Sequence, residues 1–92
     1  ARAAGKVHLL QLVVETEERA RELIARLRRG EDFYVLAHQE SVIAETAGID
    51  VGFIEVESIQ EAFREPVRRL AVGEFTEPIA TDRGYHVFKR VE

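Results

Sequence analysis

Residues 78–89 read Pro78-Ile79-Ala80-Thr81-Asp82-Arg83-Gly84-Tyr85-His86-Val87-Phe88-Lys89, and this stretch decides the fold. Its centre, residues 82–84, predicts a turn, because Asp and Gly are favoured where a chain reverses direction. Extended segments are indicated on both sides, over residues 75–80 and 85–91, so residues 79–87 can pair as a β-hairpin. The chain therefore ends in two antiparallel strands.

A third strand is predicted at the other end of the chain. Residues 6–14 are rich in leucine and β-branched residues and are apolar on both alternating faces, which is typical of a central strand buried on both sides. A terminal hairpin together with a buried central strand favours a small α+β sheet wrapped by helices.

Two helices are predicted directly after this strand. Thr16 can cap the first, with acidic residues following it and arginines near its other end, and Gly30 ends it. Asp32 can cap the second, shorter helix. Residues 40–52 show no clean period and predict a loop that leads into an extended segment over residues 51–56.

A third helix is predicted after residue 58. Ser58 and Glu61 match a capping box, in which each side chain bonds the other residue's free backbone amide. Pro66 interrupts the helical run, so we expect a kink or a restart there, with Pro66 in a first turn. The apolar stripe of this segment consists of Ile59, Phe63, Val67 and Leu70.

The composition bounds the class of protein. The chain has 92 residues, 46% of them hydrophobic and 33% charged, which indicates one globular domain with a modest core. Its net charge of -4 disfavours a nucleic-acid-binding role, which needs a surplus of Lys and Arg. No apolar run approaches the roughly 18 residues that span a bilayer, so we expect a soluble fragment without membrane insertion.

The residue content also bears on domain boundaries and chemistry. Methionine is absent, so we expect residues 1–5 to be a disordered N-terminal remnant and residues 6–92 to be one domain excised from a longer chain. Cysteine is absent too, which excludes disulfides and thiolate chemistry. The 3 histidines lie far apart without a paired spacing, so we predict no metal site and no cofactor.

Several blocks, taken in order, resemble the parvulin family of peptidyl-prolyl isomerases. Residues 30–37 resemble its G-x-D-F-x-x-L-A helix start, and residues 48–53 its G-G-D-L-G-W turn. Phe63 and residues 70–74 fall at the family's distances from that turn, and residues 78–89 resemble its P-V-x-T-x-x-G-Y-H-I-I-K end. The resemblance implies a small four-stranded, mostly antiparallel sheet wrapped by three to four helices.

The resemblance also assigns polar residues to an active site. His86 matches the histidine of the G-Y-H block, and Gln11 stands where the family carries a second histidine in the first strand. Glutamine can orient His86 by a hydrogen bond but cannot take up a proton. The family's Cys or Asp falls at Val42 or Ile43, which are apolar. Glu40 or Glu45 could reach inward from the same loop instead.

A pocket for the proline ring is implied by matching apolar positions. Phe63 matches the family's phenylalanine, Ile59 replaces its methionine and Val51 its leucine, so apolar bulk is kept. Thr81 matches the family's threonine. The basic loop with which some parvulins select phosphorylated sites is absent between Val14 and Glu17.

The remaining candidates are interpreted as structural. His8 lies three residues before Gln11, so a regular strand places it on the opposite face. We expect His38 to face solvent from the second helix and Arg83 to be a solvated turn cation.

Three functions stay open on these residues. The first is a weak bacterial peptidyl-prolyl isomerase that assists protein folding and acts on extended polypeptides containing Xaa-Pro. The second is a catalytically degenerate module that binds such segments as a chaperone or docking domain, and the third is a structural spacer. Family habit alone suggests the cell envelope or periplasm, as part of a larger foldase.

Overall fold

The computed structural model describes residues 6–42 and 46–92, so the predicted remnant at residues 1–5 lies outside the described residues. The elements in chain order are β1 (Lys6–Val14), α1 (Glu17–Arg28), α2 (Phe33–Glu40), α3 (Thr46–Ile49), β2 (Asp50–Glu55), the 3-10 helix η1 (Val56–Ser58), α4 (Glu61–Arg68), β3 (Ile79–Thr81) and β4 (Gly84–Arg90).

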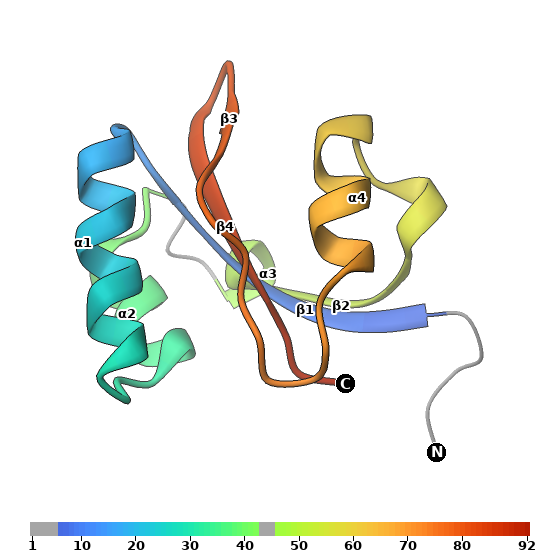
Figure 1. Cartoon of the computed structure of the whole chain (residues 1–92), viewed down its shortest axis with the longest axis horizontal. Coiled ribbons are helices and arrows are strands. Elements are labelled where there is room, and N and C mark those ends of the chain that lie inside the picture. Colours follow the sequence, from blue (N-terminus) through green and yellow to red (C-terminus); the bar gives the residue numbers. More distant parts are fainter. Residues whose placement is uncertain (1–5, 43–45) are drawn as a thin grey trace.

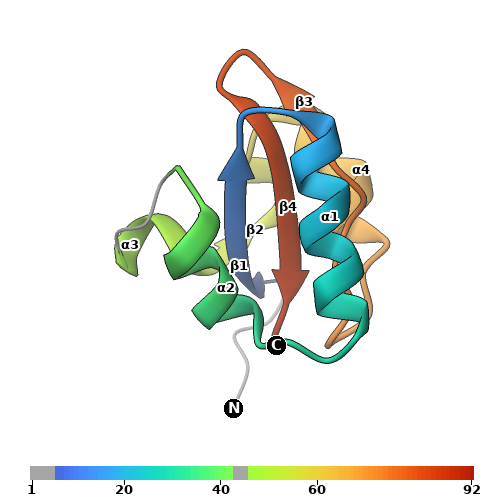
Figure 2. The ribbon, with the colours of Figure 1, turned by 90° about the vertical axis from the view of Figure 1, so that its left-hand side faces the viewer.

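The sheet has 4 strands in the order β2-β1-β4-β3, and each neighbouring pair is antiparallel. β1 is therefore central, as predicted. Helices α1 and α2 cover one side of the sheet and α4 covers the other (Figure 1). The view turned by 90° shows β1 and β4 side by side, with α1 packed along β4 (Figure 2). The α+β class and the expected sheet are confirmed.

Two hydrophobic cores lie on opposite sides of this sheet because successive strand side chains point to opposite faces. The larger core joins the sheet to the first three helices: Leu12, Val14, Ala20, Leu23, Ile24, Leu27, Phe33, Leu36, Ala37, Ile49 and Val87. The smaller core lies beneath α4: Val7, Leu9, Phe63, Val67 and Phe88. The candidate site belongs to the smaller core.

The predicted caps of the first two helices are confirmed. The Thr16 hydroxyl accepts a hydrogen bond from the Arg19 amide at 3.1 Å, and the Asp32 carboxylate accepts one from the Val35 amide at 3.0 Å. Each bond satisfies an amide that the helix itself leaves without a partner.

The predicted capping box of the third helix is wrong. Ser58 lies in η1 and donates its hydroxyl to the Glu55 carbonyl at 2.7 Å, while the N-cap of α4 is Gln60, which makes no side-chain capping bond. The predicted restart at Pro66 is also wrong, because α4 runs through it. A proline removes one backbone bond, and burial of Phe63 and Val67 holds this short helix in place.

Two further segments differ from the sequence prediction. The expected loop over residues 40–52 contains the short helix α3, which buries Ile49. The expected extended run over residues 75–80 is a strand only at Ile79–Thr81, with an isolated bridge between Phe75 and Lys89. Propensity alone does not reveal these tertiary contacts.

The β3–β4 turn depends on Gly84. Its φ is +131°, and a Cβ built there would lie 2.4 Å from the Val14 carbonyl oxygen. We expect Gly84→Ala to lower the free energy of unfolding by about 2–4 kcal/mol, combining left-handed strain with a backbone clash. Urea denaturation measures the change.

Gly73→Ala is the matched control. Gly73 has a φ of +93° but nothing within 4 Å of the added Cβ, so it carries the strain without the clash. Equal losses of stability in the two variants would show that the approach of Val14 to Gly84 does not constrain the hairpin.

Candidate active site

The candidate site forms where β1 and β4 pair. Gln11 lies opposite Phe88 and His86 lies opposite Val13, so Gln11 and His86 are diagonal neighbours. Both side chains point to the α4 side, because residues two positions apart on a strand share a face. Gln11 lies two residues from Leu9 and His86 two residues from Phe88, and both Leu9 and Phe88 belong to the smaller core beneath α4. The register of one strand pair thus brings together residues 75 positions apart.

His86 is surrounded by three of the predicted site residues. Its Nδ1 lies 3.4 Å from Gln11 Oε1, and its Nε2 lies 2.8 Å from Thr81 Oγ1. The rings of His86 and Phe63 lie 4.8 Å apart between their centroids. His86 is only 5% exposed. The structure therefore assembles a buried imidazole with polar partners on two strands and an aromatic wall from α4.

A hollow of about 230 Å³ opens beside this cluster. It is lined by Gln11, Val51, Ile54, Ile59, Gln60, Phe63 and Phe88. Drug-sized ligands need larger pockets, so this volume suits one small ring. The predicted wall residues Phe63, Ile59 and Val51 all line it. Thr81 does not, and meets the site through His86.

Sequence reasoning missed Ile54, Gln60, Phe88 and Gly48. Phe88 follows His86 at the strand period of two, which could have identified it. Ile54 lies opposite Val7 in the β1–β2 pairing, a tertiary register that the sequence of β2 alone does not specify. Gly48 contributes only its carbonyl oxygen, which accepts a hydrogen bond from Gln11 Nε2 at 2.9 Å.

The position of the family's Cys or Asp supplies no polar group among the described residues. Val42 is 54% exposed, and its amide donates to the Val13 carbonyl at 2.8 Å. Ile43 and Glu45 lie outside the described residues.

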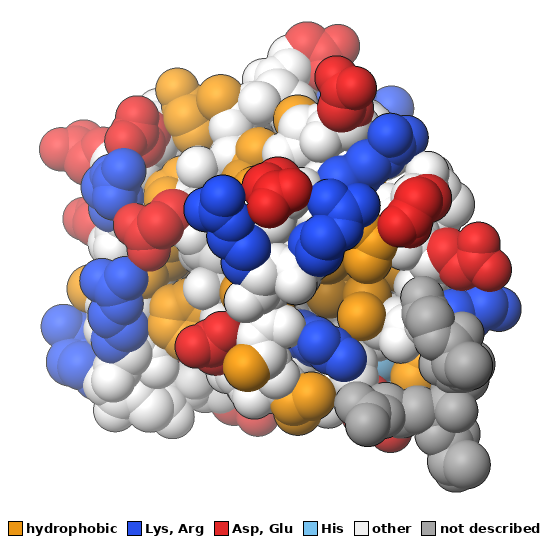
Figure 3. Space-filling model, turned by 45° about the vertical axis from the view of Figure 1, so that its right-hand side comes forward, with side chains coloured by type: hydrophobic (Ala, Val, Ile, Leu, Met, Phe, Trp, Pro, Cys, Tyr) orange, Lys and Arg blue, Asp and Glu red, His pale blue; other side chains and the backbone are white. Residues whose placement is uncertain are grey.

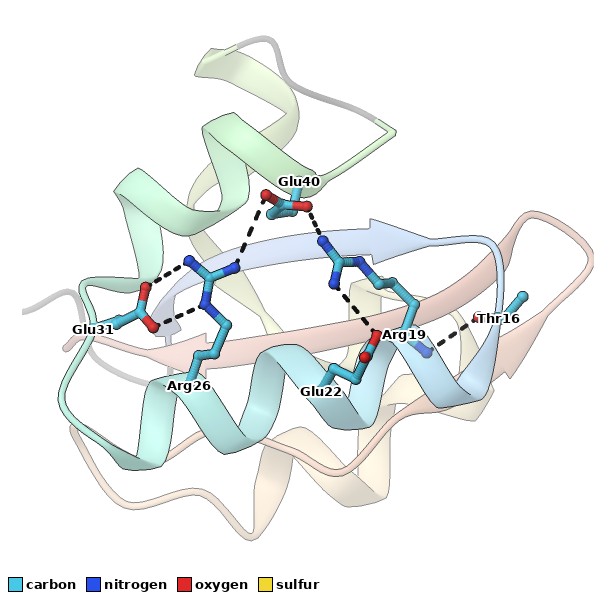
Figure 4. Close-up of polar contacts among 6 residues, drawn as sticks. All are labelled: Thr16, Arg19, Glu22, Arg26, Glu31 and Glu40. Atoms are coloured by element: carbon cyan, nitrogen blue, oxygen red, sulfur yellow. Dashed lines mark hydrogen bonds and ion pairs between the residues drawn. The ribbon is translucent and has the colours of Figure 1, made fainter.

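Glu40 does not reach inward as the alternative required. Its carboxylate binds Arg19 and contacts Arg26 on α1 (Figure 4). These contacts, together with the Arg26–Glu31 ion pair at 2.8 Å, join α1 to α2 and the turn before it. Glu40 is therefore a structural residue on the far side of the sheet from His86.

The remaining histidines behave as predicted. His8 Nε2 bonds Asp50 Oδ1 at 2.7 Å, linking the strands β1 and β2 away from the site. This bond lowers the pKa of the Asp50 carboxyl, and the Gly52 amide, which also bonds it, lowers it further. His38 is exposed on α2. Within the described parts of the chain, no group of three potential ligands could hold a metal ion.

Charged side chains of both signs lie on the side of the molecule that carries the site (Figure 3). Seen from the side of α4, hydrophobic side chains come to the surface in small groups between charges of both signs (Figure 3). Burial lowers the pKa of His86 below its ordinary value, and Arg83 lowers it further, while Asp82 raises it. His86 is thus held neutral near physiological pH.

The lowered pKa predicts how stability depends on pH. The unfolded chain takes up a proton on His86 near pH 6.5 while the folded chain resists it, so stability is full above that pH and falls below it. Between about pH 7.5 and pH 5.5, we expect the wild type to lose stability relative to His86→Gln, which cannot titrate. Urea denaturation at each pH measures the difference.

His38→Gln supplies the control for this titration. It keeps the buried His86 and changes a residue exposed on α2, so its stability should fall over the same pH range as that of the wild type. A wild type that keeps a constant difference from His86→Gln would contradict the neutral, buried imidazole.

The fold and the site define a class. A four-stranded antiparallel sheet with an apolar, ring-sized hollow beside a buried histidine is the arrangement of a small isomerase or peptide-binding domain. Comparison with known proteins identifies the family. Residues 11–92 match the rotamase family, described as the PPIC-type PPIase domain, and the chain belongs to it.

Curated relatives of this chain are bacterial folding factors. It is 32% identical to the periplasmic chaperone PpiD of Haemophilus ducreyi over 92% of the chain, and 36% identical to the foldase protein PrsA of Geobacillus kaustophilus over 91%. The chain spans only 14% and 31% of these relatives' own lengths.

Solved structures place the fold in the same family. The peptidylprolyl isomerase PrsA of Bacillus cereus superposes with a TM-score of 0.88 at 28% identity, covering 96% of this chain and 35% of that one. NmPin, the parvulin of Nitrosopumilus maritimus, superposes with a TM-score of 0.83 at 27% identity, covering 99% of this chain and all of its own. The parvulin resemblance is confirmed, and it supports an isomerase role in protein folding over the non-catalytic binding module.

Proposed function

We propose that this domain isomerises Xaa-Pro peptide bonds in extended protein substrates, with the proline ring seated in the hollow against Phe63. The observation that carries the proposal is the position of the hollow, which shares Phe63 and Gln11 with the surroundings of the buried His86. An apolar hollow of the size of a proline ring thus lies beside a buried polar imidazole.

Isomerisation of an Xaa-Pro bond does not require an acid or a base catalyst. An Xaa-Pro bond must rotate over a barrier of roughly 18–20 kcal/mol, and no covalent bond breaks. Twisting the amide removes its resonance and so reduces the charge on its oxygen. A site with few solvent contacts therefore disfavours the polar planar amide relative to the twisted one. Fixed dipoles in the site can further stabilise the charge distribution of the twisted amide.

Each residue has a place in this scheme. Phe63, Ile59 and Val51 form the wall for the proline ring, and a ring seated against them would exclude water from that side. His86 presents a buried, polar ring beside the wall, with Thr81 and Gln11 fixing its orientation. We therefore assign the first three to substrate binding and His86 with its two partners to the polar side of the site.

The cellular setting follows from the relatives. We propose that the domain acts on unfolded protein segments as part of a larger foldase of the cell envelope, since a relative is named a periplasmic chaperone and others are named foldases. Among the described residues, no helix has the length and hydropathy needed to cross a bilayer.

NMR exchange spectra of short Xaa-Pro peptides test the activity. Uncatalysed exchange takes roughly 10–100 s, so acceleration by the wild type would give new cross-peaks. We expect Phe63→Leu to reduce the acceleration about tenfold or more, which corresponds to losing about 1.4 kcal/mol of transition-state binding. His86→Ala should reduce it as well.

Phe53→Leu is the matched control for the aromatic wall. Phe53 is 42% exposed on β2, contacts His8 and does not line the hollow, so the same substitution there should leave exchange unchanged. If the wild type binds the peptides, as shown by shifts of Phe63 and Ile59 resonances, but exchange stays slow, the domain binds without catalysing.

A further inference from the structure

We propose that Gln11 holds His86 as a single neutral tautomer with the ring proton on Nδ1, and so acts as a positioning residue in place of a second acid or base. The hydrogen bonds around the ring carry this inference. The role of this tautomer in catalysis rests on the function proposed above, whereas the tautomer itself can be tested independently of that function.

The first argument begins at Gly48. Its carbonyl oxygen can only accept, and it lies 2.9 Å from Gln11 Nε2, so the amide nitrogen of Gln11 must face Gly48. The amide oxygen is then the atom that faces His86 Nδ1 at 3.4 Å. An oxygen that accepts requires a donor, so the proton lies on Nδ1.

The second argument begins at the β3–β4 turn. Thr81 Oγ1 accepts from the Arg83 amide at 3.1 Å, which leaves its own proton to donate. Two acceptors are in reach, His86 Nε2 at 2.8 Å and the Gly84 carbonyl at 3.4 Å, and the shorter bond is the stronger. Nε2 therefore accepts and carries no proton.

The opposite neutral tautomer cannot satisfy the same hydrogen-bond partners. With the proton on Nε2, the bare Nδ1 would face the Gln11 oxygen, and two acceptors would meet. Flipping the amide only moves the conflict to the Gly48 carbonyl. The cost falls on buried polar groups, where an unmade bond is expensive.

A protonated ring would satisfy the network differently. Both nitrogens would donate, and the Thr81 hydroxyl would turn to the Gly84 carbonyl. The charged groups near the ring are Arg83 and Asp82 of the turn, which oppose one another, and burial favours the neutral form. Gln11, unlike a carboxylate or a second histidine, adds no charge to this balance.

Long-range nitrogen spectra of the histidine rings, at neutral and mildly acidic pH, test the inference. His8→Gln and His38→Gln assign the signals. We expect wild-type His86 to show a protonated Nδ1 and a bare Nε2. Gln11→Glu should raise the pKa of His86 by about one unit or more, because a carboxylate would then face Nδ1. Gln39→Glu places the same charge on an exposed site of α2 and should leave His86 unchanged.

Two results would overturn the inference: a wild-type ring protonated on Nε2, or a folded Gln11→Glu variant whose His86 keeps its wild-type titration. The wild-type spectrum alone tests the predicted tautomer, even if the Gln11→Glu variant does not fold. A protein with the predicted tautomer that fails to accelerate peptide exchange would overturn the proposed function alone.

Discussion

The pairing of β1 with β4 is the constraint on which the rest of the structure depends. It joins the first and last strands in the centre of the sheet, with Val13 opposite His86 and Gln11 opposite Phe88. Side chains alternate along both strands, so a slip by one residue would exchange the two faces. If β4 slipped, Val87 would leave the larger core and His86 would leave the α4 side. Folding and site assembly are thus specified by the same register.

The end of that pairing shows why the register is tightly held. Gly84 begins β4 where the Val14 carbonyl approaches closely, and the absent side chain leaves room for it. One residue earlier in the chain, the turn aims the Arg83 amide at Thr81, whose hydroxyl in turn meets His86. Backbone geometry that closes the hairpin therefore also orders the polar side of the site, without any residue devoted to that purpose alone.

The sequence was sufficient for elements whose signals are local. The caps at Thr16 and Asp32, the central strand and the terminal hairpin follow from residue type and period, and the match of motifs in register places His86 beside Phe63. It was insufficient where a tertiary contact decides. Ser58 has the residue type of a cap but bonds Glu55 within η1, and Gly48 bonds Gln11 through a backbone atom that no side-chain motif encodes.

The amide of Gln11 indicates that the site needs an oriented dipole at this position and no group that transfers protons. A hydrolase moves protons, so exchanging a histidine for a glutamine in its machinery removes a step of the reaction. Rotation about a peptide bond transfers no proton. The site needs an apolar wall that excludes water and dipoles with a fixed direction. Gln11 keeps its direction because Gly48 fixes one end and His86 occupies the other. Glutamine in place of the family's first-strand histidine is therefore compatible with the family's reaction, because both ring nitrogens of His86 still have a hydrogen-bond partner.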